Sequence, residues 1–219
     1  MSAYIIVTLV AYLLGSISFS VIISKKMAGF DVREKGSGNA GATNMLRSVG
    51  KKGAIFTLIG DCLKGVVAIL FAIIVGKIAK NTDKALLVQL AGIAVVLGHT
   101  FPIFFGFKGG KGIAATSGLV ISLILFPKYC FMFTIFGMVT FGLVTKFSRY
   151  VSLGSITGII GFFIEFVIWG LVGWLPLNNN EFIEASIVVL LFVILGVARH
   201  SGNIKRLING TERKIGEKK

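Results

Sequence analysis

The sequence predicts an all-α, polytopic integral membrane protein, and two observations carry this prediction. Of its 219 residues, 55% are hydrophobic and only 15% are charged, whereas a soluble domain of this length would carry more charge. Residues 1–24 and 85–107 contain no Lys, Arg, Asp or Glu at all. Each run is longer than the roughly 20 helical residues that cross a bilayer core, so we expect both to span the membrane.

We predict seven transmembrane helices in a single domain, 1–219. Their ranges are 3–24, 53–76, 85–105, 112–126, 129–145, 152–174 and 182–199. The first has no basic residue before it and is followed by Lys25 and Lys26, which is the reverse of a cleavable signal peptide. We therefore expect this segment to remain as an anchor.

The second and third spans differ in their internal charge. The second contains Asp61 and Lys64 three residues apart, and ionisable groups at such a depth are usually paired, so we expect an internal ion pair there. The third is uncharged apart from one histidine. Cys62 and Cys130 both fall inside predicted spans, and we interpret them as packing residues rather than a disulfide.

The fourth and fifth spans are short and are separated by Pro127. An alternative with five spans, in which these two segments are re-entrant, therefore stays open. In the sixth span, Gly154, Gly158 and Gly161 recur at helical spacing, which favours close helix packing. Glu165 lies in the same span, and the sequence identifies no partner for it. The last span is an apolar run that ends at an arginine.

The basic residues fix the expected orientation. Segments 25–52, 106–111 and 146–151 and the tail from residue 199 carry 7, 2, 2 and 7 Lys and Arg residues, against 4 in the opposite loops. The positive-inside rule then places the N-terminus outside and these four segments in the cytoplasm. The net charge of +14 does not indicate nucleic-acid binding, because the charges flank apolar spans instead of forming one face of a soluble domain.

Glycines, basic residues and both histidines gather in three islands between the apolar runs. The islands are 35–47 (KGSGNAGATNMLR), 98–116 (GHTFPIFFGFKGGKGIAAT) and 199–214 (RHSGNIKRLINGTERK). Glycines let consecutive backbone amides converge on an anion, and neighbouring basic side chains can supply the countercharge. The islands therefore predict phosphate binding at the cytoplasmic edge of the membrane.

Two better-known phosphate motifs do not fit these islands. Residues 36–41 match G-x-G-x-x-G formally, but the flanking segments are predicted membrane helices instead of the strands that a dinucleotide site requires. GFKGGKG is not a phosphate loop of the nucleotidase type, because Lys111 is followed by glycine instead of Ser or Thr. The remaining candidates for countercharge are Arg47, Lys108 and Lys111.

We expect different roles for the two histidines. His99, at the cytoplasmic end of the third span, could bind substrate, but a hydrogen-bonded structural role stays open. His200 and Asn203 lie at i and i+3, so they share one face if the last helix continues through them. A neutral imidazole can move protons at cytoplasmic pH. The motif H-x-x-x-x-D, which many thioester-dependent acyltransferases carry, is absent from the sequence. A cluster of metal-ligand residues is also absent, so we expect neither a metal nor a cofactor.

The three islands resemble the three motifs of the bacterial acyl-phosphate:glycerol-3-phosphate acyltransferases. Residues 36–47 match G-S-G-N-x-G-x-T-N-x-x-R, 98–112 match G-H-x-F-P-x-F-x-x-F-K-G-G-K-G, and 200–214 match H-x-x-N-I-x-R-L-x-x-G-x-E-x-K. Residues 148–156 (SRYVSLGSI) resemble the remaining cytoplasmic loop of that family. The chain departs from the family pattern at 112–116 and at Ser201, which stands where an arginine is common.

The resemblance implies transfer of a fatty acyl group from acyl phosphate to the 1-hydroxyl of sn-glycerol 3-phosphate. The products would be lysophosphatidic acid and phosphate, made without a covalent intermediate by a monomer in the bacterial cell membrane, with its active site on the cytoplasmic face. A small transporter for an anionic metabolite is the alternative, and a lipid-binding scaffold is a third possibility.

The resemblance also implies the site residues. The catalytic set is Ser37, Arg47, Lys108, His200 and Asn203. The substrate-binding set is Gly36, Gly38, Asn39, Gly41, Thr43, Asn44, His99, Gly109, Gly110, Lys111, Ser148, Arg149 and Lys205. In this interpretation the first island holds the acyl phosphate head, Lys108 supplies countercharge, and the loop at 148 helps hold the glycerol phosphate. His200 and Asn203 orient the attacking hydroxyl.

Overall fold

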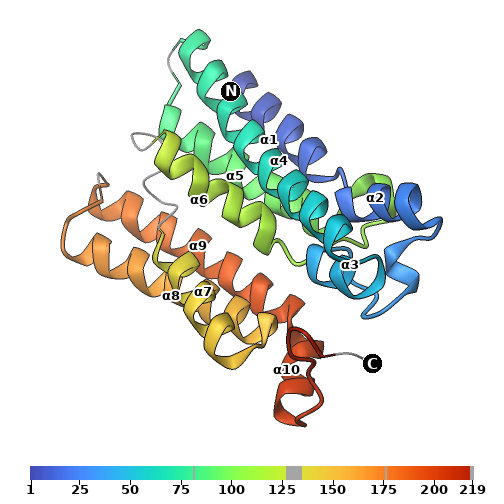
Figure 1. Cartoon of the computed structure of the whole chain (residues 1–219). Coiled ribbons are helices and arrows are strands. Elements are labelled where there is room, and N and C mark those ends of the chain that lie inside the picture. Colours follow the sequence, from blue (N-terminus) through green and yellow to red (C-terminus); the bar gives the residue numbers. More distant parts are fainter. Residues whose placement is uncertain (81, 127–134, 176, 218–219) are drawn as a thin grey trace. The chain divides into compact units, whose positions relative to one another are not determined.

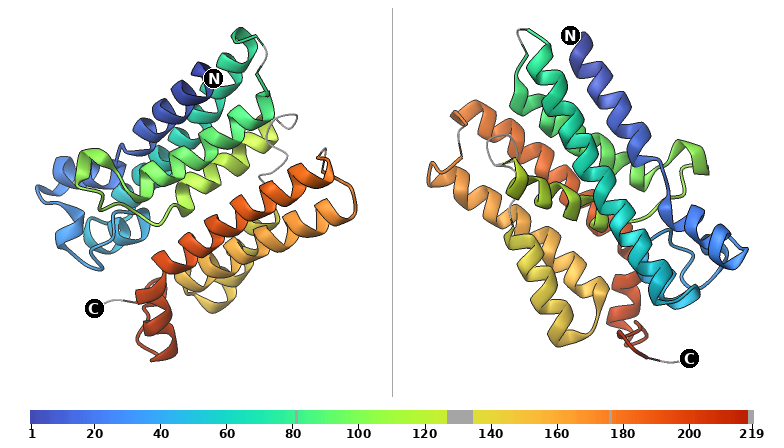
Figure 2. Two further views of the ribbon diagram at one scale, coloured as in Figure 1. Left: turned by 180° about the vertical axis from the view of Figure 1, so that it is seen from behind. Right: turned by 45° about the horizontal axis from the view of Figure 1, so that its top comes forward.

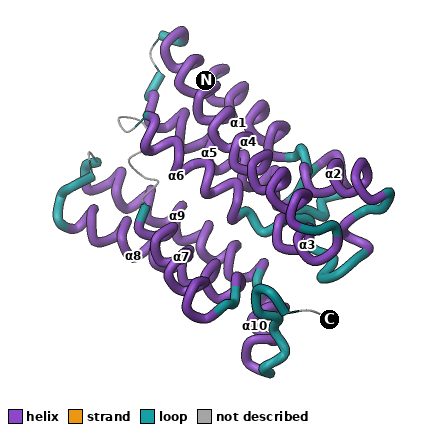
Figure 3. Tube along the Cα trace, in the orientation of Figure 1, coloured by secondary structure: helices purple, strands orange, loops and turns teal. Residues whose placement is uncertain are grey.

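The computed structural model describes residues 1–80, 82–126, 135–175 and 177–217. Every regular element among these residues is a helix (Figure 3). The chain divides into two compact units, Met1–Cys130 and Phe131–Lys219. The all-α class is therefore confirmed, while the single acyltransferase domain over 1–219 stays a prediction.

Four long helices form the body of the first unit. They are α1 (Ser2–Gly15), α4 (Lys51–Ile78), α5 (Lys84–Thr100) and α6 (Ile113–Leu125), and they run side by side (Figures 1 and 2). Helix α1 packs against α5 and α4, and α4 also packs against α6. Many large apolar side chains on these helices remain exposed, as expected for helices that contact lipid.

Short elements gather at the end of the first unit where α4 begins. These are α2 (Phe19–Ala28), the 3₁₀ helix η1 (Val32–Glu34), α3 (Ala42–Ser48) and the 3₁₀ helix η2 (Ile103–Phe105). Val21, Val32, Ala40 and Met45 form a small buried core between them. This core holds the first island against the bundle, so the island is folded by local packing even though its own residues are mostly small and polar.

The first apolar run is two helices, and the prediction of one continuous helix over 3–24 is wrong. Helix α1 ends at Gly15 and α2 begins at Phe19. The ammonium of Lys64 donates hydrogen bonds to the carbonyls of Gly15 and Ile17, both at 2.9 Å. The buried charge thus replaces helical hydrogen bonds at this break, which a hydropathy pattern cannot reveal.

Close contact between α1 and α5 depends on two glycines. A Cβ atom at Gly15 would collide with the backbone carbonyl of Val95, and one at Gly98 would collide with that of Tyr12. Because backbone cannot move aside as a flexible side chain can, only glycine fits at these positions. The approach brings the C-terminal end of α5, and hence His99, beside the break in the first apolar run.

The second unit contains α7 (Phe136–Ser148), α8 (Val151–Leu171), α9 (Asn179–Arg199) and α10 (Ser201–Ile208). Helix α7 packs on α8, and a Cβ atom at Gly158 would lie 2.8 Å from the carbonyl oxygen of Gly137. The expected packing role of the glycines in the sixth span is thus confirmed. Glu165, for which the sequence offered no partner, accepts a hydrogen bond at 3.1 Å from the backbone N–H of Phe136 at the start of α7.

Among the described residues, four segments are long and apolar enough to cross a membrane, namely Ser2–Ala28, Lys51–Ile78, Lys84–Phe105 and Val151–Leu171. A fifth arises if Ala185–Arg199 and Ser201–Ile208, bent by 57°, form one broken span. The two predicted short spans correspond to α6 and α7, although residues 129–134 of the expected fifth span lie outside the described residues, as does Cys130. Membrane character is confirmed, and the count of seven spans stays a prediction.

Candidate active site

Asn44 organises the first island from inside. Its side chain is buried, and its Oδ1 accepts a hydrogen bond at 2.9 Å from the backbone N–H of Ser37. Its Nδ2 donates to the carbonyls of Val32 and Lys35, at 2.8 and 3.0 Å. Asn44 was expected among the substrate-binding residues; these contacts make it the support that shapes the loop carrying Ser37.

Two glycines let this loop turn tightly around Asn44. Gly36 has φ of 61° and Gly38 has φ of 72°, which are left-handed conformations that other residues rarely adopt. A Cβ atom at Gly36 would also collide with Oδ1 of Asn44. Ser37 and both glycines are exposed, while Asn39, Gly41 and Thr43 are half-buried. Arg47 lies exposed in the last turn of α3, so the island presents hydroxyl, amide and guanidinium groups near one another.

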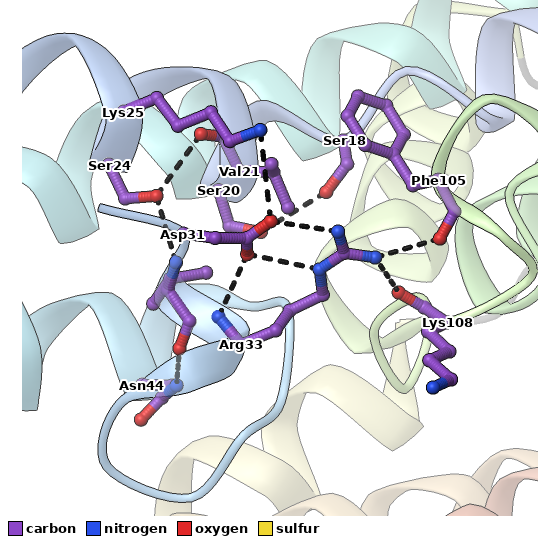
Figure 4. Close-up of polar contacts among 11 residues, drawn as sticks. Ser18, Ser20, Val21, Ser24, Lys25, Asp31, Arg33, Asn44, Phe105 and Lys108 are labelled. Carbon is purple, nitrogen blue, oxygen red and sulfur yellow. Dashed lines mark hydrogen bonds and ion pairs between the residues drawn. The ribbon is translucent and has the colours of Figure 1, made fainter. Parts of the chain in front are cut away.

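Arg33 lies in η1, two residues before the first island, and ties this segment to the second island (Figure 4). Its Nε and Nη2 donate to the two carboxylate oxygens of Asp31 at 3.0 and 2.8 Å. Its Nη1 donates to the carbonyls of Phe105 and Lys108, at 2.7 and 3.3 Å. Residues that lie 72 apart along the chain are therefore joined, and η1, directly before the first island, is held against the loop of the second. Neither Asp31 nor Arg33 was among the predicted site residues.

Asp31 is held ionised by its neighbours. The side-chain hydrogen bond from Arg33 lowers the pKa of this carboxyl below its ordinary value of 3.8, against an opposing effect of burial. Lys25 adds a weaker attraction across 4.0 Å. Because the carboxylate favours the charged guanidinium in turn, the pKa of Arg33 is raised. The link between the islands is thus a charged pair at all physiological pH values.

His99 lies beneath the glycine turn of the second island. Its Nδ1 is 2.9 Å from the ammonium of Lys64 and 3.4 Å from the carboxylate of Asp61, and all three side chains are buried. Asp61 and Lys64 are themselves 2.9 Å apart, so the predicted internal ion pair is confirmed. A hydrogen-bonded structural role for His99, left open by the sequence, is thus observed.

The glycine turn rests directly on that histidine. The N–H of Gly110 donates to the carbonyl of His99 at 3.1 Å, and the N–H of Gly109 donates to that of Thr100 at 3.2 Å. A Cβ atom at Gly110 would collide with the imidazole of His99 and with the carbonyl of Ala40 from the first island. Both glycines are buried, whereas Lys108 is exposed and Lys111 half-buried. The turn is therefore fixed from below, with its two lysines beside the first island.

In the second unit, the chain bends at His200. Helix α9 ends at Arg199 and α10 begins at Ser201, so the helix does not continue through His200, and the condition on which His200 and Asn203 were expected to share one helical face is not met. The two residues are instead joined because the N–H of Asn203 donates to the carbonyl of His200 at 2.8 Å. His200 Nδ1 lies 2.7 Å from the carbonyl of Gly196, which can only accept a hydrogen bond. In a neutral ring, the acceptor nitrogen is therefore Nε2.

In the second unit, the carboxylate of Glu212 accepts hydrogen bonds from three side chains. Its Oε1 accepts from Asn203 Nδ2 at 2.9 Å and from the hydroxyl of Ser152 at 3.1 Å, and its Oε2 accepts from Arg206 Nε at 2.7 Å. Burial alone would raise the pKa of this carboxyl, but the three donors outweigh it and lower the pKa below 4.5. Glu212 thus joins α8 to α10 and orients the amide of Asn203, a function that the sequence did not reveal.

The loop between α7 and α8 is bound to the C-terminal segment. Ser148 donates to the carbonyl of Val144 at 2.6 Å and accepts from the N–H of Tyr150 at 3.1 Å. Arg149 Nη2 donates to the carbonyl of Ile215 at 2.7 Å, and the N–H of Ile215 donates to that of Arg149 at 2.8 Å. Lys205 is exposed on α10. The structure therefore gathers the predicted site residues into two groups, one within each unit.

The third island and the loop at 148 fold together, as the first and second islands do. Residues 5–210 match the family model described as glycerol-3-phosphate acyltransferase. The chain belongs to the glycerol-3-phosphate acyltransferase family. The resemblance noted from the three islands is thereby confirmed, and the chain is an acyltransferase of the membrane.

Other members of the family match along almost the whole chain. Glycerol-3-phosphate acyltransferase of Clostridioides difficile is 44% identical over 218 residues, covering 99% of this chain and 98% of the relative. That of Shouchella clausii is 44% identical over 210 residues, covering 96% and 95%. The matches extend through all three islands and the apolar runs between them.

Two crystal structures of PlsY, described as an integral membrane glycerol 3-phosphate acyltransferase, have a similar fold. The glycerol 3-phosphate form has a TM-score of 0.76 and 35% identity, and the lysophosphatidic acid form has 0.73 and 34%. Each comparison covers 99% of this chain and 96% of the PlsY chain. The family's fold thus extends over both units of this acyltransferase.

Proposed function

We propose that this glycerol-3-phosphate acyltransferase moves a fatty acyl group from acyl phosphate to the 1-hydroxyl of sn-glycerol 3-phosphate. The products are lysophosphatidic acid and inorganic phosphate, and the step begins phospholipid synthesis. The observation that carries the proposal is the contact of the Arg33 guanidinium, directly before the first island, with the carbonyls of Phe105 and Lys108 in the second (Figure 4). Ser37 and Arg47 belong to the first island and Lys108 to the second.

The first unit supplies groups suited to the donor. Ser37, the amides of residues 36–41 and Arg47 hold the acyl phosphate head, and Lys108 places a positive charge at the reacting centre. An exposed ammonium on a loop fixed from below is preorganised, so it stabilises developing negative charge without first reorganising. Asn44 and His99 act here through the backbone that they support.

The second unit supplies groups suited to the acceptor. We expect Lys111, Ser148, Arg149 and Lys205 to help hold the phosphate of glycerol 3-phosphate. His200 and Asn203 orient its 1-hydroxyl. The contact between His200 Nδ1 and the carbonyl of Gly196 leaves Nε2 as the basic nitrogen of a neutral ring, and this is the atom that we expect to face the hydroxyl. Glu212 fixes the amide of Asn203 from behind.

The chemistry needs no covalent intermediate on the protein. Acyl phosphate is a mixed anhydride, so the hydroxyl oxygen attacks the carbonyl carbon directly and the bond from that carbon to the phosphate oxygen breaks. The hydroxyl proton passes to His200 Nε2 or to the departing phosphate. Rate acceleration then comes from orienting the two substrates and stabilising the oxyanion.

The proposed setting is the bacterial cell membrane, where the protein acts as a monomer. Seven spans with the N-terminus outside would place all three islands and the loop at 148 at the cytoplasmic face. The acyl chain of the donor would lie in the lipid while its phosphate reaches the islands. Support for this orientation comes from the distribution of Lys and Arg residues described above.

Purified protein given both substrates should form lysophosphatidic acid and phosphate in equal amounts. Omission of either substrate should abolish lysophosphatidic acid formation. If no acyl transfer occurs but proteoliposomes containing the protein show flux of a phosphorylated anion, the transporter alternative replaces this proposal.

A further inference from the structure

Arg33, in η1 directly before the first island, donates side-chain hydrogen bonds into the loop of the second island. Its guanidinium is largely shielded, with 24% of the side chain exposed, and Asp31 is more deeply covered at 8%. The edge of the guanidinium formed by Nε and Nη2 binds Asp31, and the remaining nitrogen, Nη1, reaches the two carbonyls (Figure 4). All contacts lie within the first unit.

The geometry requires arginine at this position. A guanidinium presents five donors in a rigid plane, so it can bind a carboxylate with one edge and two carbonyls with its other nitrogen. Lysine has the same charge but a single nitrogen, which cannot reach both sides at once. Asp31 is in turn fixed because its carboxylate also accepts from the backbone N–H of Arg33 at 3.0 Å.

The two carbonyls that Arg33 binds lie on either side of an unusual turn. Gly106 has φ of 65° and the following Phe107 has φ of 59°, a left-handed conformation that is unfavourable for a bulky residue. The N–H groups of Phe105 and Phe107 both donate to the carbonyl of Pro102, at 3.1 and 2.9 Å. These bonds close the turn locally, and Arg33 holds it on both sides from outside.

Lys108 directly follows this turn. Its carbonyl points to the guanidinium of Arg33, while its side chain extends away from it (Figure 4). A hydrogen bond at this carbonyl therefore fixes the backbone position from which the Lys108 side chain extends. Loss of that bond leaves the charge present but lets its position vary.

We propose that Arg33, braced by Asp31, is a positioning residue that holds the left-handed turn at 106–107 so that the ammonium of Lys108 stays in its reactive place. The inference rests on the proposed role of Lys108. It assigns to Arg33 no contact with substrate: the residue acts through the backbone of the neighbouring loop.

A double-mutant cycle tests whether Arg33 acts through Lys108. Loss of one such charged hydrogen-bond set should lower kcat of Arg33→Gln roughly 10- to 100-fold. Because the effect passes through Lys108, Arg33→Gln combined with Lys108→Ala should be no more than about twofold slower than Lys108→Ala alone. Lys26→Gln, which removes an exposed charge from neighbouring α2, is the matched control and should retain parental kcat. Losses that multiply in the double variant would overturn the proposal.

A spin label gives a measurement that does not depend on catalysis. Phe107→Cys carries a nitroxide in a background where Cys62 and Cys130 are replaced by alanine. Its spectrum should sharpen when Arg33→Gln or Arg33→Lys is added, because the turn gains motion, and should not change with Lys26→Gln. Arg33→Lys keeps the positive charge, so the measurement can be made on this variant if Arg33→Gln does not fold.

The two measurements separate the inference from the role of Lys108. An unchanged spectrum in both Arg33 variants would overturn the positioning role, whatever the kinetics. If the spectrum sharpens in the Arg33 variants but Lys108→Ala keeps the parental kcat, the turn is held by Arg33 while Lys108 is not needed for acyl transfer.

Discussion

Arg47 and Lys108 are the residues on which the proposed chemistry depends most. Both are exposed cations next to backbone that is held by buried neighbours. Replacing either by alanine should lower kcat by roughly 10²–10³, since that is the usual effect of losing one preorganised donor to developing charge. The measurement is the initial rate of lysophosphatidic acid formation by each purified variant.

Lys108→Arg should recover only part of the lost rate, because a planar guanidinium differs in shape from an ammonium. Lys26→Gln again serves as the control for loss of one positive charge. Near-parental rates for both alanine variants would show that these residues contact lipid headgroups and not the reacting substrates.

The sequence pointed to candidate site residues through their motifs, but it did not reveal the contacts that hold these residues in place. Arg47, Lys108 and Ser37 could be proposed as site residues because their residue types suit phosphate and their motifs resemble a known family. Arg33 was missed because its partners lie 72 and 75 residues away in the chain, and one sequence does not show which loops meet. Glu212 was missed as an organiser for a similar reason, since Ser152 is 60 residues distant.

At the scale of elements, the glycine turn at 109–110 should tolerate no side chain at Gly110. A methyl group there would collide with the His99 imidazole and the Ala40 carbonyl, and neither can move without disturbing an island. Gly110→Ala should therefore lower kcat/KM for glycerol 3-phosphate at least about tenfold, as misplacement of a positioning loop does. Steady-state kinetics of the purified variant checks this.

Gly142→Ala is the matched control, because a Cβ atom at that position in α7 meets nothing within 4 Å. It should leave the kinetics unchanged. If Gly110→Ala has parental kinetics as well, the second island does not need its observed close packing.

The stability that Glu212 contributes by joining α8 to α10 should depend on pH. Its pKa is lowered in the folded protein, so its stabilising effect is present above the ordinary value of 4.5 and is lost as pH falls through the lowered folded pKa. Glu212→Gln should lower the melting temperature in detergent at pH 7 by roughly 3–12 °C, because it weakens charged hydrogen bonds to buried groups.

The difference in melting temperature between parent and Glu212→Gln should shrink as pH is lowered below 4.5, since the parent carboxylate then also becomes neutral. Glu217→Gln, in the exposed C-terminal segment, should show little effect at either pH. A difference for Glu212→Gln that stays constant with pH would argue against the ionised carboxylate as the source of stability.

At the scale of the whole molecule, the fold class and the major apolar segments were predictable from hydropathy, because a bilayer imposes long uncharged helices. The break at residues 16–18 and the bend at His200 were not, because each depends on polar contacts within an apolar run. Gly15 and Ile17 bind a lysine from another helix. The first break lies beside His99, which contacts the same lysine, and the second lies at His200 itself.

The predicted orientation of the chain can be tested with single cysteines in the background lacking Cys62 and Cys130. In intact cells, an impermeant thiol reagent should label Lys80→Cys but not Ser37→Cys or Ser201→Cys, all three of which are exposed positions. All three should react after permeabilisation. Labelling of Ser37→Cys from outside would reverse the proposed topology and remove the site from the cytoplasmic face.

The proposed donor is the central claim, and it follows from the abundance of phosphate-binding groups. A thioester such as acyl-CoA would place neutral sulfur where Ser37, Arg47 and Lys108 are expected to meet a phosphate. Losing two charged hydrogen bonds of about 1.5–3 kcal/mol each would slow the reaction by about two orders of magnitude or more.

The most direct test is therefore lysophosphatidic acid formation by the purified enzyme with acyl phosphate and with acyl-CoA of the same chain length. Rapid product formation is expected with acyl phosphate, accompanied by an equal amount of inorganic phosphate, and a rate at least about 100-fold lower is expected with acyl-CoA. Comparable rates with the two donors would contradict acyl phosphate as the specific donor.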